Sequence, residues 1–240
     1  MESINLQNFD TKNVKDMSKM FLSCTKLISL TTSASFDTSK VTDMTSMFEK
    51  CTSLTSIDLN NFKATSMKEM PYMFSDCISL KEIDLSSFKN NKLENIINLF
   101  KDCISLTSIN LKDFNTEYIV DMSYAFTGCE SLTSLDLFSF DTENVKYLND
   151  LFNGCASLTY LVLSRFVTSN VTTMSRMISG CKKLSNLSLL SFDTKNVEDM
   201  SEMFANCESI KQLDLKHFYT SKVTILSGMF SGCTSLIQKK

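Results

Sequence analysis

The sequence repeats itself with a period of 26 residues, and this repetition constrains the fold more than any other feature. The segment "MSKMFLSCTKL", from Met17 to Leu27, returns as "MTSMFEKCTSL" from Met44 and as "MSEMFANCESI" from Met200. The first interval between successive cysteines is 27 residues and the other seven are 26. A period of this length predicts a solenoid, in which each unit buries its apolar face only against its neighbours. The cysteines that mark the period are Cys24, Cys51, Cys77, Cys103, Cys129, Cys155, Cys181, Cys207 and Cys233.

Each repeat contains two different hydrophobic periods. In the first unit, the apolar residues from Met17 to Cys24 are spaced at i, i+3, i+4 and i+7, which predicts a short helix with one apolar face. After the cysteine the period changes to two, as in the apolar residues on either side of Asp58, which predicts a short strand. No composition break marks a domain boundary. We therefore expect residues 1–240 to form a single solenoid domain of the α/β class.

The pattern Cys-x-x-Leu-x-x-Leu-x-Leu-x-x-Phe resembles a leucine-rich repeat. The fuller unit, "FDTENVKYLNDLFNGCASLTYLVL" from Phe140, resembles the BspA-like repeats, also called DUF285, of bacterial and protist surface proteins. The match extends from Ile4 to Leu236. This resemblance implies a right-handed leucine-rich-repeat solenoid of about nine 26-residue units, with parallel strands on one face and short helices on the other. It also implies an exported protein that adheres or binds, and it implies no catalytic site.

The nine cysteines raise the question of disulfides or a metal site, and their spacing favours neither. No Cys-x-x-Cys pair occurs, and ligands from successive units would form a row instead of a tetrahedron. The odd number and the ladder geometry fit disulfide bonds poorly. Stacking places each cysteine about 5 Å from the next at the same inward-facing bend. We expect a buried ladder of reduced cysteines with no metal and no cofactor, and disulfides or a metal are the alternatives.

Polar residues follow the same period. The aspartates Asp58 and Asp84 belong to a column that we expect to form a solvated acidic face. Calcium shared by these two residues is the alternative, although two carboxylates supply too few oxygens. A column of threonines is expected to bond to turn backbone, and a column of aspartates is expected to cap the predicted helices. The residues concerned are Asp136 and Asp214 in the acidic column, Thr11, Thr38, Thr116, Thr142, Thr168, Thr194 and Thr220 in the hydroxyl column, and Asp16, Asp43, Asp121 and Asp199 before the helices.

The residues that alternate with the buried leucines of each strand face outward. Most of them are polar, but Phe138, Tyr160, Val162 and Leu190, from three consecutive strands, are not. Phe138 and Leu190 flank Ser164 in one row, roughly 10 Å apart. Outward apolar residues gathered in this way predict a binding patch. A loosely constrained surface, or a patch covered by a partner in the same assembly, is the alternative.

Composition and motifs argue against several functions. The net charge of −3, with acids and bases interspersed, argues against a nucleic-acid partner. No apolar run approaches the roughly 20 residues of a spanning helix, so we expect no membrane insertion by this segment. The only histidine, His217, has no catalytic constellation around it, so we expect no enzymatic activity. The segment "MESINLQNFD" lacks the features of a signal peptide, so we expect a cytosolic protein or part of an exported one.

We therefore expect a non-enzymatic binding or adhesion module at the cell surface or outside the cell, which presents its strand face to a protein or glycan partner, host-surface molecules included. Two alternatives stay open. In the first, the chain is a structural protein that self-associates end to end, because Leu6 opens the chain and Ile237 closes it without a polar cap. In the second, it is a cytoplasmic protein-interaction scaffold, which the free cysteines favour.

Overall fold

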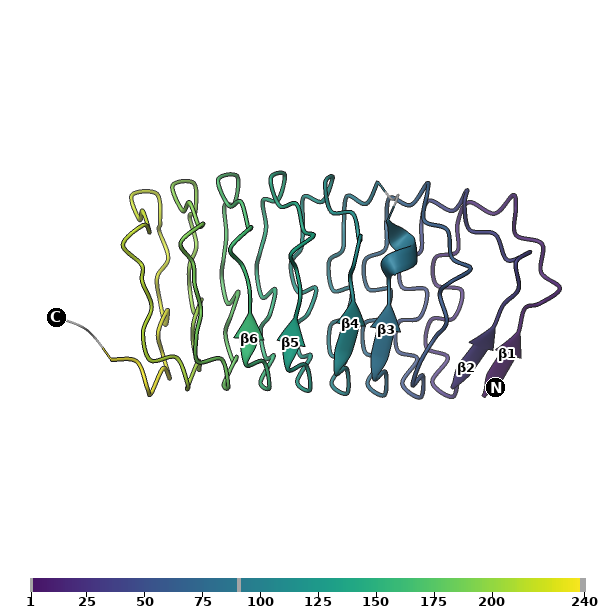
Figure 1. Cartoon of the computed structure of the whole chain (residues 1–240), viewed down its shortest axis with the longest axis horizontal. Coiled ribbons are helices and arrows are strands. Elements are labelled where there is room, and N and C mark those ends of the chain that lie inside the picture. Colours follow the sequence, from purple (N-terminus) through teal and green to yellow (C-terminus); the bar gives the residue numbers. More distant parts are fainter. Residues whose placement is uncertain (1, 90–91, 238–240) are drawn as a thin grey trace.

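The computed structural model describes residues 2–89 and 92–237. The chain winds into an elongated stack of similar turns, with the N terminus at one end and the C terminus at the other (Figure 1). We call each turn of the stack a coil and name it after its cysteine, from the Cys24 coil to the Cys233 coil. The repeat solenoid expected from the period of 26 residues is confirmed.

Short parallel strands lie along one edge of the stack (Figure 1). They pair as β1 with β2, β3 with β4, and β5 with β6. Each register joins residues one period apart, as in Ile83 with Ile109 and Leu135 with Leu161. The expected parallel strands are confirmed at these positions, but the segments around Asp58 and at residues 186–190, also expected to be strands, are not strands in the structure. Their bounds are Ser3–Asn5 for β1, Ser29–Thr31 for β2, Glu82–Asp84 for β3, Ser108–Asn110 for β4, Ser134–Leu135 for β5 and Tyr160–Leu161 for β6.

The expected short helices do not form. In the described ranges the one helical element is a 3₁₀ turn, η1 (Ser86–Phe88), which lies outside the segments predicted to be helical. Those segments are consecutive turns whose alternate N–H groups donate to the next coil. The N–H of Met17, for example, donates to the carbonyl oxygen of Asp43 at 3.0 Å, and the N–H of Phe21 donates to that of Met47 at 2.9 Å. The prediction of helices is wrong because half of these amides point along the solenoid axis toward the next coil.

Two left-handed residues in every turn segment explain why no helix forms. In the Cys24 coil they are Lys19, with a φ of 58°, and Ser23, with a φ of 60°. The same two positions recur in every later coil, down to Gly228 and Gly232 in the Cys233 coil. A left-handed residue interrupts the continuous right-handed backbone that an α-helix requires. The turns nevertheless repeat apolar residues at spacings of three and four, so their sequence imitates an amphipathic helix.

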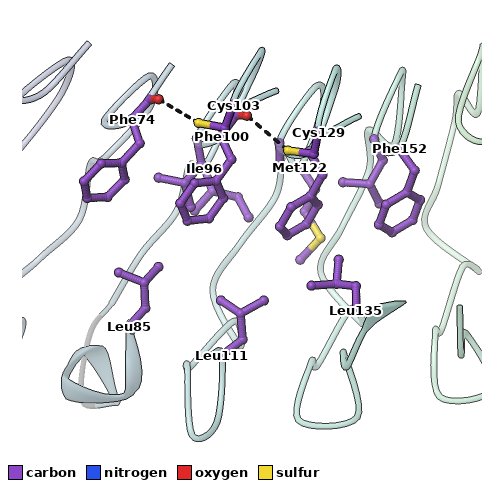
Figure 2. Close-up of a cluster of buried hydrophobic side chains, with 14 of the residues drawn as sticks. Phe74, Leu85, Ile96, Phe100, Cys103, Leu111, Met122, Cys129, Leu135 and Phe152 are labelled. Atoms are coloured by element: carbon purple, nitrogen blue, oxygen red, sulfur yellow. Dashed lines mark hydrogen bonds between the residues drawn. The ribbon is translucent and has the colours of Figure 1, made fainter. Parts of the chain in front are cut away.

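The core consists of side-chain columns that run along the stack. From Phe21 to Phe152, rings of successive coils stack with centroids 5.2 to 5.9 Å apart. Ile178 replaces the ring in the Cys181 coil, and stacking resumes between Phe204 and Phe230. Figure 2 shows members of this column above a parallel row of leucines. Stacked aromatic pairs contribute about 0.5–1.5 kcal/mol beyond the burial of their area, so this column helps to hold neighbouring coils together.

The cysteines form a second column at the bend of each coil. All nine are free, and all but Cys24 and Cys233 are buried. The Sγ atom of Cys129 donates to the carbonyl oxygen of Phe100 at 3.3 Å, one of two such bonds drawn in Figure 2. Burial raises the pKa of Cys155 to about 12. The expected ladder of buried cysteines is confirmed for the seven inner coils, and their reduced state stays a prediction.

The threonine column links coils at a different corner. The Oγ1 atom of Thr142 donates to the carbonyl oxygen of Val167 at 3.0 Å and accepts the N–H of the same residue at 2.8 Å. The expectation that these hydroxyls bond to turn backbone is confirmed for every member of the column except Thr220, which is exposed and makes no such bond within the described residues. The other threonines that donate in the same way are Thr11, Thr38, Thr116, Thr168 and Thr194.

Candidate functional site

The predicted apolar patch lies on the strand face, across three consecutive coils. Tyr160 begins β6 and pairs with Ser134 of β5, while Phe138 lies in the turn that follows β5. The exposed fractions of Phe138, Tyr160 and Leu190 are 59%, 64% and 62%. Val162 is less exposed than these three and is half-buried. The structure therefore brings the four residues to one face, three of them with most of the side chain in solvent.

The position of Phe138 is fixed from two directions. Its N–H donates to the Oδ1 atom of Asp136 at 2.9 Å, which shapes the turn. The guanidinium carbon of Arg165 lies 4.1 Å from the centroid of the Phe138 ring. A cation–π contact of this kind contributes about 0.5–1 kcal/mol at an exposed site. The ring is thus held in place before any partner arrives.

Sequence reasoning missed Arg165, although a signal was present. It is one of two arginines in the chain, and it directly follows Ser164, the residue expected between Phe138 and Leu190. Its contact with Phe138 depends on the turn after the strand, where the alternation of inward and outward residues ends. The alternation of the strand therefore did not predict which way the Arg165 side chain points.

A surface pocket of about 330 Å³ adjoins the Phe138 ring. One wall comes from β4 and its turn, and the other from the turn after β5. Asp113 in the first wall has a φ of 61°, a left-handed conformation that its counterparts in other coils do not adopt. The pocket combines apolar walls with charged and polar groups, and this combination suits a single side chain or sugar ring. Its lining residues are Ile109, Asn110, Leu111, Lys112, Asp113, Asp136, Phe138 and Ser139.

The acidic column has a structural role in the turns that follow its residues. The Oδ1 atoms of Asp58 and Asp84 accept the N–H groups of the residues two positions on, at 2.9 and 2.8 Å. Hydrogen bonds from Ser86 lower the pKa of Asp84 below its usual value. Asp136 and Asp214 form the same turns. Within residues 2–89 and 92–237, no cluster of three or more histidine, cysteine or acidic residues could hold a metal ion.

The aspartates expected to cap helices make the expected bonds without a helix. Asp16 accepts the N–H of Ser18 at 2.8 Å, and Asp199 accepts that of Ser201 at 2.8 Å. His217 is exposed in the turn before Phe218. In the described part of the chain, no helix has the length and apolar character that crossing a membrane requires.

A family model described as "Mycoplasma protein of unknown function, DUF285" matches residues 1–109, 80–162 and 159–240. The chain belongs to this DUF285 family. The three matches together span the whole sequence, so the resemblance to BspA-like leucine-rich repeats is confirmed. The description of the DUF285 family names no reaction and no ligand.

Three solved structures resemble this DUF285 chain at low TM-scores. A leucine-rich repeat protein from Bacteroides ovatus is 19% identical over 98% of this chain and 73% of its own, with a TM-score of 0.44. A leucine-rich repeat protein of T. pallidum is 21% identical over 77% and 78%, with a TM-score of 0.40. A leucine-rich cell surface protein from Faecalibacterium prausnitzii is 18% identical over 99% and 82%, with a TM-score of 0.37. No curated protein sequence matches the chain.

Proposed function

We propose that this DUF285 chain is a non-enzymatic binding module of a surface or secreted protein, and that Phe138, Tyr160, Val162 and Leu190 contact its protein or glycan partner. The observation that carries the proposal is the exposure of Phe138, Tyr160 and Leu190 on three consecutive coils. Large apolar side chains that gather on one face are a mark of interaction sites, whereas single ones need no explanation.

The solenoid makes this patch a rigid surface. Backbone hydrogen bonds join each coil to its neighbours, so the spacing of the three side chains is set before binding. A preorganised surface loses little conformational entropy when a partner binds. Burying an exposed phenylalanine or leucine side chain contributes about 1.5–3 kcal/mol, so three such anchors suffice for a specific contact.

The test is a pull-down from a host-surface or matrix extract with the wild-type chain and with a triple variant, Phe138→Ser, Tyr160→Ser and Leu190→Lys. Circular dichroism first confirms that both are folded. A matched control carries Ile78→Ser and Ile104→Ser, which remove similarly apolar, exposed side chains outside the patch. We expect partners retained by the wild type and the control to be lost from the triple variant. Equal retention by all three proteins would contradict the proposal.

Arg165 provides a finer test of the same site. Arg165→Ala removes the group stacked on Phe138 but leaves the patch itself intact. We expect it to weaken binding of a captured partner about twofold to fivefold, which corresponds to the roughly 0.5–1 kcal/mol of a cation–π contact. The midpoint of urea unfolding should change little, since surface substitutions usually alter stability by less than about 0.5 kcal/mol.

A further inference from the structure

The pocket beside Phe138 lies between the Cys103 coil and the Cys129 coil. The guanidinium of Arg165, which lies over the Phe138 ring, comes from the Cys155 coil and is not part of the pocket wall. Because the coils stack in chain order (Figure 1), the ring stands between this guanidinium and the pocket. One face of the ring is therefore occupied, and its other face is left for a ligand in the pocket.

Asp113, in the pocket wall, departs from the column of residues to which it belongs. At the same position in the neighbouring coils, Ser87 and Ser139 donate their hydroxyl groups to leucine carbonyl oxygens of the preceding coils, both at 3.2 Å. An ionised carboxylate has no proton to donate, so Asp113 cannot form this bond. Its backbone is also left-handed, with a φ of 61°. Residues in such sparsely populated conformations cluster at ligand sites, which favours a role for Asp113 toward a ligand.

The pocket holds polar groups that the fold does not use. The carboxylate of Asp113 and the ammonium group of Lys112 have no hydrogen-bond or ion-pair partner among the described residues. Asp136 accepts the N–H of Phe138 with its Oδ1 atom, and its Oδ2 atom has no partner in residues 2–89 and 92–237. The wall therefore offers free acceptors on two carboxylates and free donors on one ammonium group.

This set of groups suits a neutral ring that carries several hydroxyl groups. A hydroxyl group both donates and accepts, so a sugar can bond to the carboxylates and to the ammonium group at once. The C–H groups of a sugar ring can also pack on the negatively polarised face of an aromatic ring. A lysine or arginine side chain fits less well, because Lys112 repels it and the Phe138 ring already holds Arg165. An acidic sugar would place its own charge beside two carboxylates.

We infer that the pocket binds a single neutral hexose ring, stacked on the free face of Phe138 and hydrogen-bonded to Asp113 and Asp136. The volume of about 330 Å³ is at the lower end of the range of ligand pockets, which favours one ring over an oligosaccharide. The inference rests on the proposed function, since Phe138 belongs to both the patch and the pocket, and it names a glycan as the partner.

Ligand-observed NMR titration of the 240-residue chain with methyl glucoside, methyl galactoside and methyl mannoside tests the inference. We expect at least one of them to bind with a dissociation constant on the order of 1 mM, which is the affinity that typical ligand efficiencies give a molecule of this size. Methyl glucuronide should bind at least about fivefold more weakly, because its carboxylate would meet two others.

A variant at Asp113 isolates the pocket from the patch. Asp113→Gly removes the carboxylate and suits the left-handed backbone, so the fold should be retained, which circular dichroism checks. We expect it to weaken binding of the hexoside about tenfold, the effect of losing a hydrogen bond to a charged group. Glu82→Gln is the matched control, because it neutralises an exposed carboxylate of β3 outside the pocket, and it should bind like the wild type.

The outcomes separate this inference from the proposed function. No binding of any methyl hexoside up to about 20 mM, well above the expected constant, would overturn the inference, and so would equal binding by Asp113→Gly and the wild type. Preferential binding of N-acetyl-lysine amide would also overturn it and would identify a protein side chain as the occupant. The double variant Tyr160→Ser and Leu190→Lys, which alters the patch outside the pocket, should bind the hexoside like the wild type. A failed pull-down with intact hexoside binding would therefore count against the patch alone, and the reverse result against the pocket alone.

Discussion

The Sγ atom of Cys103 lies 3.1 Å from the carbonyl oxygen of Phe74 in the preceding coil and donates a hydrogen bond to it. The same carbonyl accepts the N–H of Cys77 in its own coil at 3.1 Å. One oxygen thus holds the bend of its own coil and ties the next coil to it (Figure 2). This arrangement requires a protonated thiol, because a thiolate could not donate the bond.

Alkaline pH should therefore destabilise the fold. The thiol of Cys155 ionises near 9.0 without its surroundings, and burial raises its pKa to about 12. Between these values the unfolded chain holds fewer protons than the folded one, so the free energy of unfolding falls as the pH rises. The loss is at most about 1.4 kcal/mol per pH unit for each buried thiol. Urea midpoints measured at several values between about pH 8 and pH 10.5 check this window.

A cysteine substitution separates this effect from other titrations. Cys155→Ala removes one buried thiol. Above pH 9.0 the free energy of unfolding should therefore fall less steeply with pH, by the slope that corresponds to about one proton. At neutral pH the same variant should be less stable by about 1–2 kcal/mol, because a cavity forms and one hydrogen bond is lost. A wild-type midpoint that stays constant up to about pH 10.5 would contradict the prediction.

Thr142 should be intolerant of an isosteric apolar replacement. Its side chain is 1% exposed and exchanges two hydrogen bonds with the backbone of Val167. Thr142→Val keeps the volume but leaves the N–H and the carbonyl of Val167 without this partner, which should lower the free energy of unfolding by about 1–3 kcal/mol. Thr142→Ser keeps the hydroxyl and should lose less. Urea unfolding of both variants measures the difference, and equal losses would show that the hydroxyl is unimportant.

At the left-handed positions, removing a glycine should lower the stability of the fold, and introducing one should raise it. Gly154 has a φ of 75°, and a Cβ atom there would lie 3.6 Å from the nearest atoms of Gly128, which is ordinary contact. Gly154→Ala should therefore cost only the backbone strain, about 1 kcal/mol. Lys50 has a φ of 61°, so Lys50→Gly should raise stability by up to about 1 kcal/mol. Thermal unfolding of the pair tests the sign, and a loss in both variants would contradict the explanation.

Arg176 should matter for stability despite its exposure. It forms two hydrogen bonds with the carboxylate of Asp150, at 2.8 and 3.2 Å, and the Asp150 side chain is only 3% exposed. Arg176→Leu leaves this carboxylate buried, with the amide of Asn153 as its remaining side-chain donor. The free energy of unfolding should therefore fall by about 2–3 kcal/mol. Adding Asp150→Asn removes the charge and should recover part of the loss. Chemical denaturation of the single and double variants measures this coupling, and additive effects would argue against it.

The helix prediction shows where sequence periodicity misleads. Met17 and Phe21 are spaced as on one face of a helix, and both are buried as that pattern requires. The pattern reports only which side chains face inward, however, and turns that bond to a neighbouring coil produce the same spacing. Lys19 and Ser23 adopt left-handed backbone conformations, which lysine and serine do not predict. The glycines were the available signal, because all five occupy these left-handed positions, yet five of the nine coils have no glycine at either position.

The candidate site was predictable only in part. The outward positions of Phe138, Tyr160 and Leu190 followed from strand alternation, which is a local rule. The half-burial of Val162, the contact between Arg165 and Phe138 and the adjoining pocket depend on the turns between coils. In these turns, backbone direction is set by hydrogen bonds to residues one period away, which no local pattern encodes.

The sequence by itself determined the solenoid, its period of 26 residues and the identity of its cysteine, threonine and phenylalanine columns. It could do so because a repeat whose apolar face cannot be buried within one unit must stack on its own copies. Only the tertiary structure decided that the turn segments bond between coils instead of within a helix. The reason is that a backbone N–H group gains as much stability from a hydrogen bond to the next coil as from one within its own segment. Only stacking brings the carbonyl acceptor of the next coil within reach.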